Sequence, residues 1–256
     1  MKNGYLVSDV ISAMEEIAPM SIACEWDHVG LMVGDVSEPV EGVLLTLDAV
    51  SGSVQEAVNV GANLIISHHP LFFAPVREID FQTSKGKIIR DLIKNDISLF
   101  AAHTNLDKAE KGVNQALAGV IGVSETELVD SVEVGLVGVI KEGPKSLRDF
   151  AEDVKEKLGA TGFILNTDKD CRISRVFVQG GAFDEDAIPF LKNAGIDCIV
   201  TGEMKHHHML ELEELEIPAI ICGHEVTERI VLPSVKEQLL HKLPNLPVSI
   251  FYGHKW

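Results

Sequence analysis

The segment LLTLDAVSGSVQEAVNVGANLIISH, residues Leu44–His68, indicates how this chain folds. It begins and ends with an apolar run that is typical of a strand, and the stretch between the two runs has the pattern of a helix. The second run contains Leu64-Ile65-Ile66 without interruption, as expected of a strand that is covered on both faces of its sheet. The segment therefore predicts the strand–helix–strand unit of an α/β protein.

The alternation of strand-like and helical patterns continues along most of the chain. Strands are predicted at Val43–Leu47, Asn63–Ser67, Ser98–Ala102, Leu136–Ile140, Arg175–Gln179, Asp197–Thr201, Ala219–Cys222 and Val248–Tyr252. Helices are predicted at Ser8–Ala18, Gly86–Asn95, Leu147–Leu158, Asp184–Asn193 and Val226–Leu240. We therefore expect an α/β fold in which mixed sheets are covered by helices.

A second segment, VFVQGGAFDEDAIPFLKNAGIDCIVTG at Val176–Gly202, repeats the arrangement of the first. Each segment contains a strand, a turn of small residues, a helix, a Gly-Ala or Ala-Gly pair and a second apolar strand that ends at polar residues. Each half then has another strand end with a histidine and an acid four residues later, His103 with Asp107 and His224 with Glu228. Chance similarity between generic α/β units is the alternative, but we predict an internal duplication.

The duplication predicts two related α/β units with a metal-binding cleft between them. We expect residues 1–130 and 221–256 to form the first unit, which carries most of the metal ligands, and residues 131–220 to form the second. No linker rich in serine or glycine separates the halves.

The composition limits the classes of function. The 256 residues are 46% hydrophobic and 24% charged, which is typical of globular proteins. The formal net charge of −17 repels phosphate backbones, so a nucleic-acid partner is not expected. No signal sequence and no apolar run of about 20 residues is present, so we expect a cytoplasmic protein without a membrane partner. The four cysteines form no CxxC pair, and we expect reduced, mostly buried thiols.

Histidines and acids gather where strands are predicted to end. His68 and His69 follow a strand directly and precede Pro70, and the carboxyl ends of strands are where ligands bind in open α/β sheets. Adjacent residues at a strand end can diverge, so each histidine could bind a different ion. His224 and Glu228 are four residues apart at the start of a predicted helix, where such a pair shares one face.

Imidazole and carboxylate ligands together suit zinc, manganese, iron or cobalt better than calcium. A carboxylate can bridge two ions, so we predict two divalent ions per chain, bound by His68, His69, Asp107, His224 and Glu228. The alternatives are that Asp107 only caps a helix near Lys108 and that Glu228 only lines an acidic helix face.

Other motifs are less informative. Consecutive residues of a helix point about 100° apart, so His206-His207-His208 cannot all converge on one ion, and we expect one of them to face the cleft. Gly180-Gly181 matches no nucleotide-binding glycine motif, and no GxSxG elbow is present. Cys222 is explained at least as well by a structural thiol as by a nucleophile.

Five motifs, in order, resemble those of the NGG-interacting-factor-3-like family, whose members are often called GTP cyclohydrolase I type 2 homologues. They are EWDHVGLMVG at Glu25–Gly34, ISHHPLFF at Ile66–Phe73, AHTNLD at Ala102–Asp107 followed by GVN at Gly112–Asn114, TGEMKHH at Thr201–His207, and GHEVTER at Gly223–Arg229. His28 departs from the asparagine that is usual in the first motif. The chain is short enough to be a compact member without the inserted domain of larger members.

The resemblance implies a dinuclear site in which His69 and Asp107 bind one ion, His68 and His224 bind the other, and Glu228 bridges the two. It also implies catalytic roles for His103, which would orient Asp107 or handle protons, and for His207, which would line the cleft. Compact members form toroidal homohexamers, and Phe72 and Phe73 are candidates for an apolar subunit interface.

The resemblance implies a metal-dependent hydrolase of a nucleotide-like small molecule, with ring opening of GTP and release of formate as the reaction in the family name. Two other functions fit the same residues: a non-catalytic metal-binding or regulatory protein, and a two-metal phosphoesterase. No residue in the sequence selects guanine.

Overall fold

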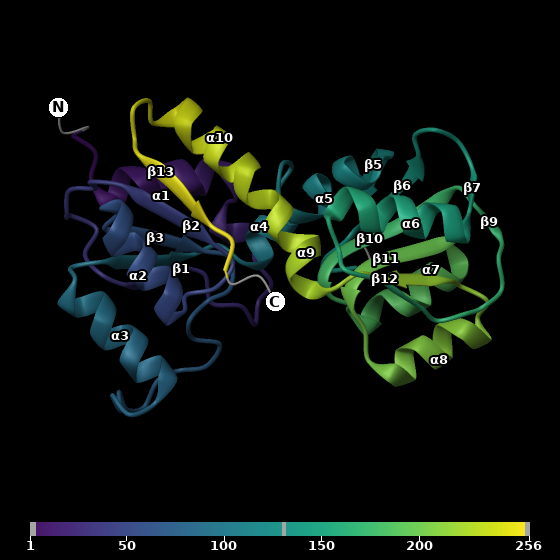
Figure 1. The fold of residues 1–256 in the computed structure, drawn as a ribbon, viewed down its shortest axis with the longest axis horizontal. Helices are drawn as coiled ribbons and strands as arrows, with labels where there is room; N and C mark the ends of the chain where they lie inside the picture. Colours follow the sequence, from purple (N-terminus) through teal and green to yellow (C-terminus); the bar gives the residue numbers. More distant parts are fainter. Residues whose placement is uncertain (1–3, 130–131, 254–256) are drawn as a thin grey trace. The chain divides into compact units, whose positions relative to one another are not determined.

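The computed structural model describes residues 4–129 and 132–253 of the chain. The chain forms two compact units, the first from residues 1–109 and 232–256 and the second from residues 110–231. Each unit contains a sheet covered by helices, so the predicted α/β class with mixed sheets is confirmed (Figure 1).

The boundaries of the units differ from the predicted ones, which were 1–130 with 221–256, and 131–220. Strand β5 (Val123–Leu128) pairs antiparallel with β6 (Leu136–Ile140), so the segment before residue 130 belongs to the second sheet. At the other boundary, α9 (His224–Glu228) follows β12 (Ala219–Ile221) directly, and β12 is a strand of the same second sheet. The two candidate ligands on α9 are therefore part of the second unit and not of the first.

The sheet of the first unit has the strand order β1-β4-β3-β2-β13. Its strands are β1 (Gly30–Val33), β2 (Val43–Thr46), β3 (Leu64–Ser67), β4 (Ser98–Ala101) and β13 (Val248–Phe251). The last four run parallel to one another, and β1 is antiparallel to β4. Every residue of β2, β3 and β4 is buried, as the continuous apolar runs predict for strands covered on both faces.

Helices cover both faces of this first sheet. In Figure 1, α1 (Val7–Ile17) and α10 (Leu232–Lys242) lie together on one face, and α2 (Ser51–Val60) and α3 (Ser84–Lys94) lie together on the other. Leu44, Ile65 and Leu99 come from three neighbouring strands and belong to the core under α2 and α3. Because side chains alternate along a strand, the residues between them point to the opposite face.

The sheet of the second unit has the strand order β5-β6-β10-β11-β12-β8. Its remaining strands are β8 (Ile164–Leu165), β10 (Arg175–Ala182) and β11 (Cys198–Glu203), and a separate pair is formed by β7 (Lys145–Ser146) and β9 (Arg172–Ile173). Strands β10, β11 and β12 are parallel, whereas β6 and β8 are antiparallel to their partners. The unit thus has a parallel centre with antiparallel edges.

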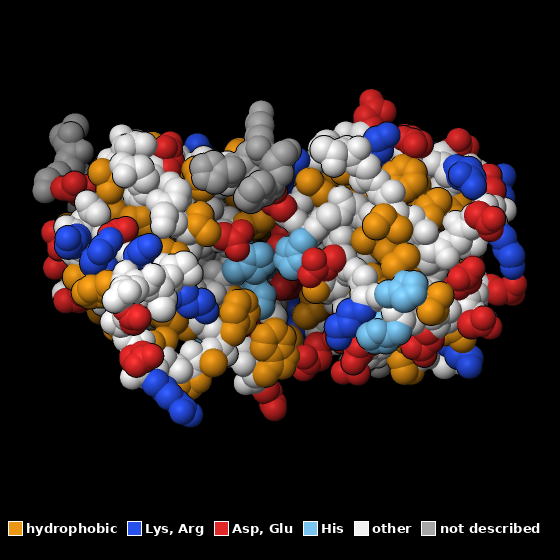
Figure 2. Space-filling model, turned by 60° about the horizontal axis from the view of Figure 1, so that its bottom comes forward, with side chains coloured by type: hydrophobic (Ala, Val, Ile, Leu, Met, Phe, Trp, Pro, Cys, Tyr) orange, Lys and Arg blue, Asp and Glu red, His pale blue; other side chains and the backbone are white. Residues whose placement is uncertain are grey.

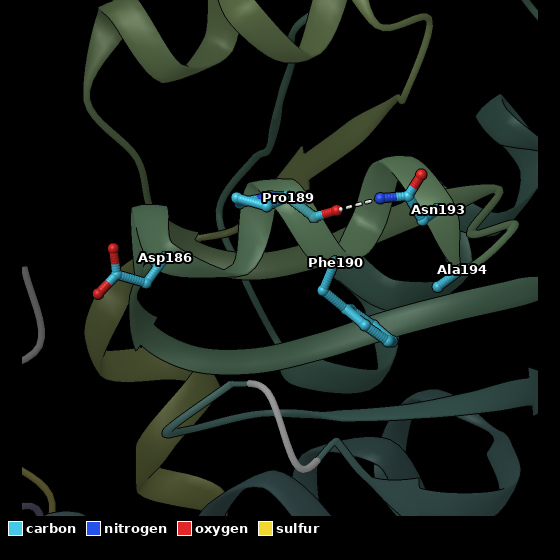
Figure 3. A pocket seen from close by; sticks show the side chains of 5 residues that line it. All are labelled: Asp186, Pro189, Phe190, Asn193 and Ala194. Atoms are coloured by element: carbon cyan, nitrogen blue, oxygen red, sulfur yellow. Dashed lines mark hydrogen bonds between the residues drawn. The ribbon is translucent and has the colours of Figure 1, made fainter.

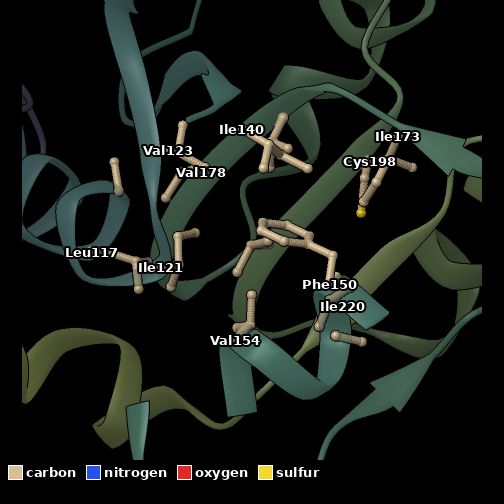
Figure 4. Close-up of a cluster of buried hydrophobic side chains, with 14 of the residues drawn as sticks. Leu117, Ile121, Val123, Ile140, Phe150, Val154, Ile173, Val178, Cys198 and Ile220 are labelled. Carbon is tan, nitrogen blue, oxygen red and sulfur yellow. The ribbon is translucent and has the colours of Figure 1, made fainter. Parts of the chain in front are cut away.

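The alternation of side chains along β10 divides the core of the second unit into two layers. Val176 and Val178 pack in one cluster with α5 (Val113–Ile121) and α6 (Leu147–Leu158), which Figure 4 shows around Phe150. Phe177, between the two valines, belongs to the opposite cluster. That cluster also contains residues of the helices α7 (Ile188–Asn193) and α8 (His206–Glu214).

Both units contain three parallel strands joined by two helices, β2-α2-β3-α3-β4 in the first and β10-α7-β11-α8-β12 in the second. This shared connectivity agrees with the repeated sequence pattern. A common origin of the two halves stays a prediction.

Two predicted helices differ from the structure. In Asp184–Asn193, the first part is the 3-10 segment η2 (Glu185–Ala187), and only α7 is α-helical. The segment Val226–Leu240 is not continuous, because a 3-10 turn, η3 (Arg229–Val231), separates α9 from α10. Pro233 has no N–H to donate to the carbonyl of Arg229, and its ring would clash with that carbonyl in a continuous helix.

Two further expectations concern membranes and thiols. Within residues 4–129 and 132–253, no helix has the length and apolar content needed to cross a bilayer. All four cysteines are free thiols, and Cys24, Cys198 and Cys222 are buried whereas Cys171 is exposed.

Candidate metal centre

Three histidines of the first unit lie at the carboxyl ends of two neighbouring parallel strands. His68 and His69 follow β3, His103 follows β4, and the strands are in register with Ser67 opposite Ala101. The backbone N–H groups of His68 and His69 continue the ladder to β2, at 3.0 and 2.8 Å from the carbonyl oxygens of Thr46 and Leu47. One ring nitrogen of each histidine lies within 4.8 Å of those of the other two. The three histidines therefore lie together at this sheet edge.

The hydrogen bonds of the three rings determine which nitrogen of each ring has a lone pair. His68 Nδ1 lies 2.9 Å from the carbonyl oxygen of Ala102, and His69 Nδ1 lies 2.9 Å from Asp48 Oδ1. His103 Nδ1 lies 3.0 Å from the carboxylate of Asp27. Carbonyl and carboxylate oxygens only accept hydrogen bonds, so each Nδ1 donates and each neutral ring has its lone pair on Nε2. Metal-binding histidines are oriented in this way by the hydrogen bond of their other nitrogen.

The fourth candidate of this unit, Asp107, lies in α4 (Thr104–Lys108). Its Oδ1 is 3.6 Å from His68 Nε2, and its side chain is largely buried. Asp107 lies inside α4, and no helix begins at Lys108. The alternative that Asp107 caps a helix there is therefore wrong. The carboxylate lies beside His68, which the resemblance assigns to the other ion.

Asp27 had no role in the sequence analysis, although it lies in the first family-like motif. Its carboxylate is enclosed and accepts hydrogen bonds from His103 Nδ1 and from the Thr104 N–H (3.0 Å) and hydroxyl (2.6 Å). Burial raises the pKa of this carboxyl, but the hydrogen bonds from His103 and Thr104 outweigh burial and hold the pKa well below its usual value. The Asp27 carboxylate, ionised at neutral pH, therefore holds the His103 ring in position.

Two aromatic side chains lie against the ring of His103. The rings of Trp26 and Phe73 approach it edge-on, with centroid distances of 6.0 and 5.7 Å, and both residues are exposed. Phe72 is partly buried and packs against the core, which leaves Phe73 as the more exposed of the two interface candidates. His28, where this chain departs from the family motif, is also exposed.

In the second unit, His224 and Glu228 are the first and last residues of α9. His224 Nε2 lies 3.1 Å from Glu228 Oε1, as the spacing of four residues predicts, and His224 Nδ1 lies 3.2 Å from Glu203 Oε1 at the end of β11. Only 5% of the Glu228 side chain is exposed, so it does not belong to a solvated acidic face. A buried carboxylate beside an imidazole is suited to bind a cation.

Glycines make the room for Glu228. Gly181 has φ +65°, and a Cβ atom at this position would lie 2.1 Å from Glu228 Oε1. At Gly202, a Cβ would lie 2.6 Å from the hydroxyl oxygen of Thr227, which accepts a hydrogen bond from the Gly181 N–H. The Gly180-Gly181 pair, which matched no nucleotide motif, therefore brings the backbone of β10 close to the acid of α9.

His207 lies in a different group of side chains in the second unit. Ligand atoms of Glu185, His207 and His208 lie within 4.8 Å of one another, and His208 is buried whereas the other two are exposed. Figure 2 shows histidine side chains beside acidic and basic ones on the surface of this unit. His206, the first histidine of the run, is exposed and is not part of the group.

Two other features offer neither a metal site nor a reactive nucleophile. An open hollow of about 400 Å³ is lined by Asp186, Pro189, Phe190, Asn193 and Ala194, with one carboxylate and no histidine (Figure 3). Burial raises the pKa of Cys222 to about 12, so this thiol stays protonated and is a poor nucleophile.

The sequence analysis assigned no role at the site to four residues: Asp27, Asp48, Glu203 and Gly181. Asp48 follows β2 and Glu203 ends β11, so the rule that ligands gather at the carboxyl ends of strands could have identified both. No local signal connects Asp27 to His103, because the two residues are 76 positions apart.

Comparison with known proteins gives consistent results. The family model Duf34/NIF3 (NGG1p interacting factor 3) matches residues 5–254. The chain is 32% identical over 254 residues to a "GTP cyclohydrolase 1 type 2 homolog" of Clostridium acetobutylicum, covering 95% of this chain and 94% of that protein. A Streptomyces coelicolor protein of the same name is 35% identical over 232 residues, with 87% and 81% covered.

Solved structures with a similar fold cover nearly the whole chain. A Bacillus cereus protein related to NIF3 has a TM-score of 0.88 at 25% identity, and a Staphylococcus aureus hypothetical protein has a TM-score of 0.90 at 27% identity. Each alignment covers 98% of both chains. The match of the family model, the sequence identity and the fold agree, and this chain belongs to the Duf34/NIF3 family.

Proposed function

We propose that the protein is a hydrolase that depends on two divalent metal ions and acts on a nucleotide or a related small molecule. The observation that carries the proposal is the hydrogen bonding of the three histidines of the first unit. Each ring donates its Nδ1–H to a carbonyl or carboxylate oxygen, which leaves the lone pair of Nε2 for a metal ion.

The donor set fits a transition-metal ion. The first unit offers His68, His69 and Asp107, and the second offers His224 and the buried Glu228. We propose that His69 and Asp107 bind one ion, that His68 and His224 bind the other, and that Glu228 bridges them. The mixture of neutral imidazoles and carboxylates favours zinc, manganese, iron or cobalt over calcium.

Bound metal ions of this kind activate water near neutral pH and polarise the group that is attacked. The residues of the chain position the reacting groups and transfer protons. Asp27 fixes the His103 ring, whose Nε2 can accept a proton from one group and return it to another. The rings of Trp26 and Phe73 lie edge-on against that ring and support its orientation.

The names of the relatives favour ring opening of GTP as the first reaction to test. In the experiment, protein of measured metal content is incubated with a panel of nucleotides, and the products are identified. Formate release supports the cyclohydrolase reaction, whereas inorganic phosphate supports the two-metal phosphoesterase. Absence of turnover with every nucleotide, at full metal content, would contradict the hydrolase proposal and favour a metal-binding or regulatory protein.

A matched control separates metal-dependent turnover from contamination. Protein that has been stripped of metal and then reconstituted should regain the lost activity. His103→Gln keeps a hydrogen-bonding side chain but cannot transfer a proton, so it should lower kcat by about 100-fold. Unchanged kcat in this variant would remove His103 from the mechanism.

We also propose that the chain assembles into a homohexamer of toroidal shape. The formal charge of −17 per chain repels other copies, so assembly needs a substantial apolar interface, and the exposed Phe73 is a candidate for it. Light scattering should give one species of about six chains. A monomer at micromolar concentration would contradict the assembly.

A further inference from the structure

We infer that Glu185, His207 and His208 form a second metal-binding site, separate in sequence from the five proposed ligands of the dinuclear centre. The three residues come from two elements of the second unit, η2 (Glu185–Ala187) and the first turn of α8. One ligand atom of each lies within 4.8 Å of the others.

His208 anchors the site. Only 4% of its side chain is exposed, its Nε2 lies 2.5 Å from Glu185 Oε2, and its ring packs edge-on against Phe183. Among residues 4–129 and 132–253, its buried Nδ1 has no hydrogen-bond partner. Within the described residues, the ring therefore has one nitrogen at the Glu185 carboxylate and one that no protein group uses, so it is available to a further ligand.

His207 supplies the second imidazole. Its ring centroid is 4.0 Å from that of His208, at an interplanar angle of 70°. A ligand atom of His207 lies within 4.8 Å of one of His208 and of an oxygen of Glu185, although the two histidines are adjacent on the helix. The three histidines of the run do not all converge, since His206 is outside the group. This assigns His207 a ligand role instead of the catalytic role that the family resemblance implies.

The distances allow binding after small movements. Ligand nitrogens and oxygens about 2.1 Å from a tetrahedral ion are roughly 3.4 Å from one another. When an ion binds, the short contact between His208 and Glu185 must lengthen, and the longest distance between ligand atoms of the group must shorten. The side chains of Glu185 and His207 are exposed, so they can move without disturbing the core. Two imidazoles and one carboxylate leave a fourth position for water, which is the ligand set of open zinc sites.

One neighbour opposes a cation. Lys205 Nζ lies 3.5 Å from Glu185 Oε2, and this lysine together with His208 lowers the pKa of the Glu185 carboxyl. The ammonium competes with a metal ion for the same carboxylate. Because Lys205 is exposed, its side chain can turn to solvent when an ion binds.

The test measures zinc per chain after equilibrium dialysis against buffered free Zn²⁺, first in the double variant His69→Ala with His224→Ala, which lacks one proposed ligand of each ion of the dinuclear centre. In this background, about one ion per chain should remain and should be lost with His207→Gln or Glu185→Gln. His206→Gln is the matched control, since it removes an exposed neighbouring histidine outside the group. Lys205→Met should raise zinc affinity by about five-fold, because it removes a competing charge.

Two outcomes would overturn the inference. One is that His207→Gln and Glu185→Gln bind as much zinc as the His206→Gln control. The other is that all three variants lose zinc equally, which would indicate a nonspecific histidine run at the surface. Both exposed positions avoid the core, and circular dichroism of each variant checks that the fold is kept. The measurement is independent of hydrolase activity, so it stands if the proposed function fails.

Discussion

The helices α4 and α9 use the same histidine and acid spacing in two different ways. In α9, His224 Nε2 and Glu228 Oε1 are 3.1 Å apart and face one another. In the corresponding pair at α4, His103 and Asp107 have other partners. His103 Nδ1 donates a hydrogen bond to Asp27, and Asp107 Oδ1 lies 3.6 Å from His68 Nε2. His103 precedes α4 as its N-cap, with φ −109° and ψ −106°, whereas His224 is the first helical residue of α9.

The difference shows what a spacing of four residues determines. Such a pair shares a face only when both residues are inside the helix. In α9 this condition holds, so local geometry makes the contact. At α4 the histidine lies outside the helix, and its hydrogen-bond partner, Asp27, comes from a distant segment of the chain.

The largest expected effect tests the α9 pair. Glu228→Gln removes the charge with which a carboxylate spans two cations, so metal content should fall from about two ions per chain to below one. Asp107→Asn should remove only about one. Elemental analysis measures both. Glu225→Gln is the control, because Glu225 lies on the same helix as Glu228 but its Oε1 lies 3.4 Å from Arg229 Nη1. Full retention of both ions by Glu228→Gln would disprove the bridge.

The next effect tests the α4 pair. Asp27→Asn replaces an ionised acceptor of three donor groups, so it should lower the free energy of unfolding by about 3 kcal/mol. The pKa of Asp27 is lower in the folded protein, so its stabilisation is complete above the ordinary value of 3.8 and decreases as pH falls below that value. Denaturant unfolding at several pH values measures this. A loss of the same size at pH 3 and pH 7 would contradict the pKa argument.

A smaller effect is expected at the glycine that makes room for Glu228. Gly181→Ala introduces a Cβ against the buried carboxylate at a positive φ, and it should lower the free energy of unfolding by about 2 kcal/mol. Metal content should fall together with stability, because the acid must move. Gly195→Ala, at φ +62° with nothing within 4 Å, is the matched control for backbone strain alone. Equal losses in the two variants would show that Glu228 needs no such space.

The smallest effect is expected at Glu203, whose contact with His224 is exposed. Glu203→Gln keeps a hydrogen-bond acceptor and removes a charge that solvent already screens, so stability should change by less than about 1 kcal/mol. Thermal unfolding measures the change. A larger loss would show that His224 depends on Glu203 as strongly as His103 depends on Asp27.

Much of the fold could be predicted because its core strands are continuous apolar runs. All the predicted strands are present, and helix α6 has the predicted bounds, Leu147–Leu158. The missed strands are short or polar, such as β5 with its sequence VSETEL, because pairing at a sheet edge needs few apolar residues. The failure at Val226–Leu240 came from reading amphipathic periodicity across Pro233.

The sequence alone determined the α/β class, the family and the candidate ligands, because strand cores and short motifs are local patterns. The tertiary structure decided the partners of those ligands: Asp27 and Asp48 for two ring nitrogens, and Gly181 for the space around Glu228. It also decided that α9 belongs to the second unit, since β12 pairs in that sheet. These features depend on segments far apart in the chain, which only the packing of the sheets brings into contact.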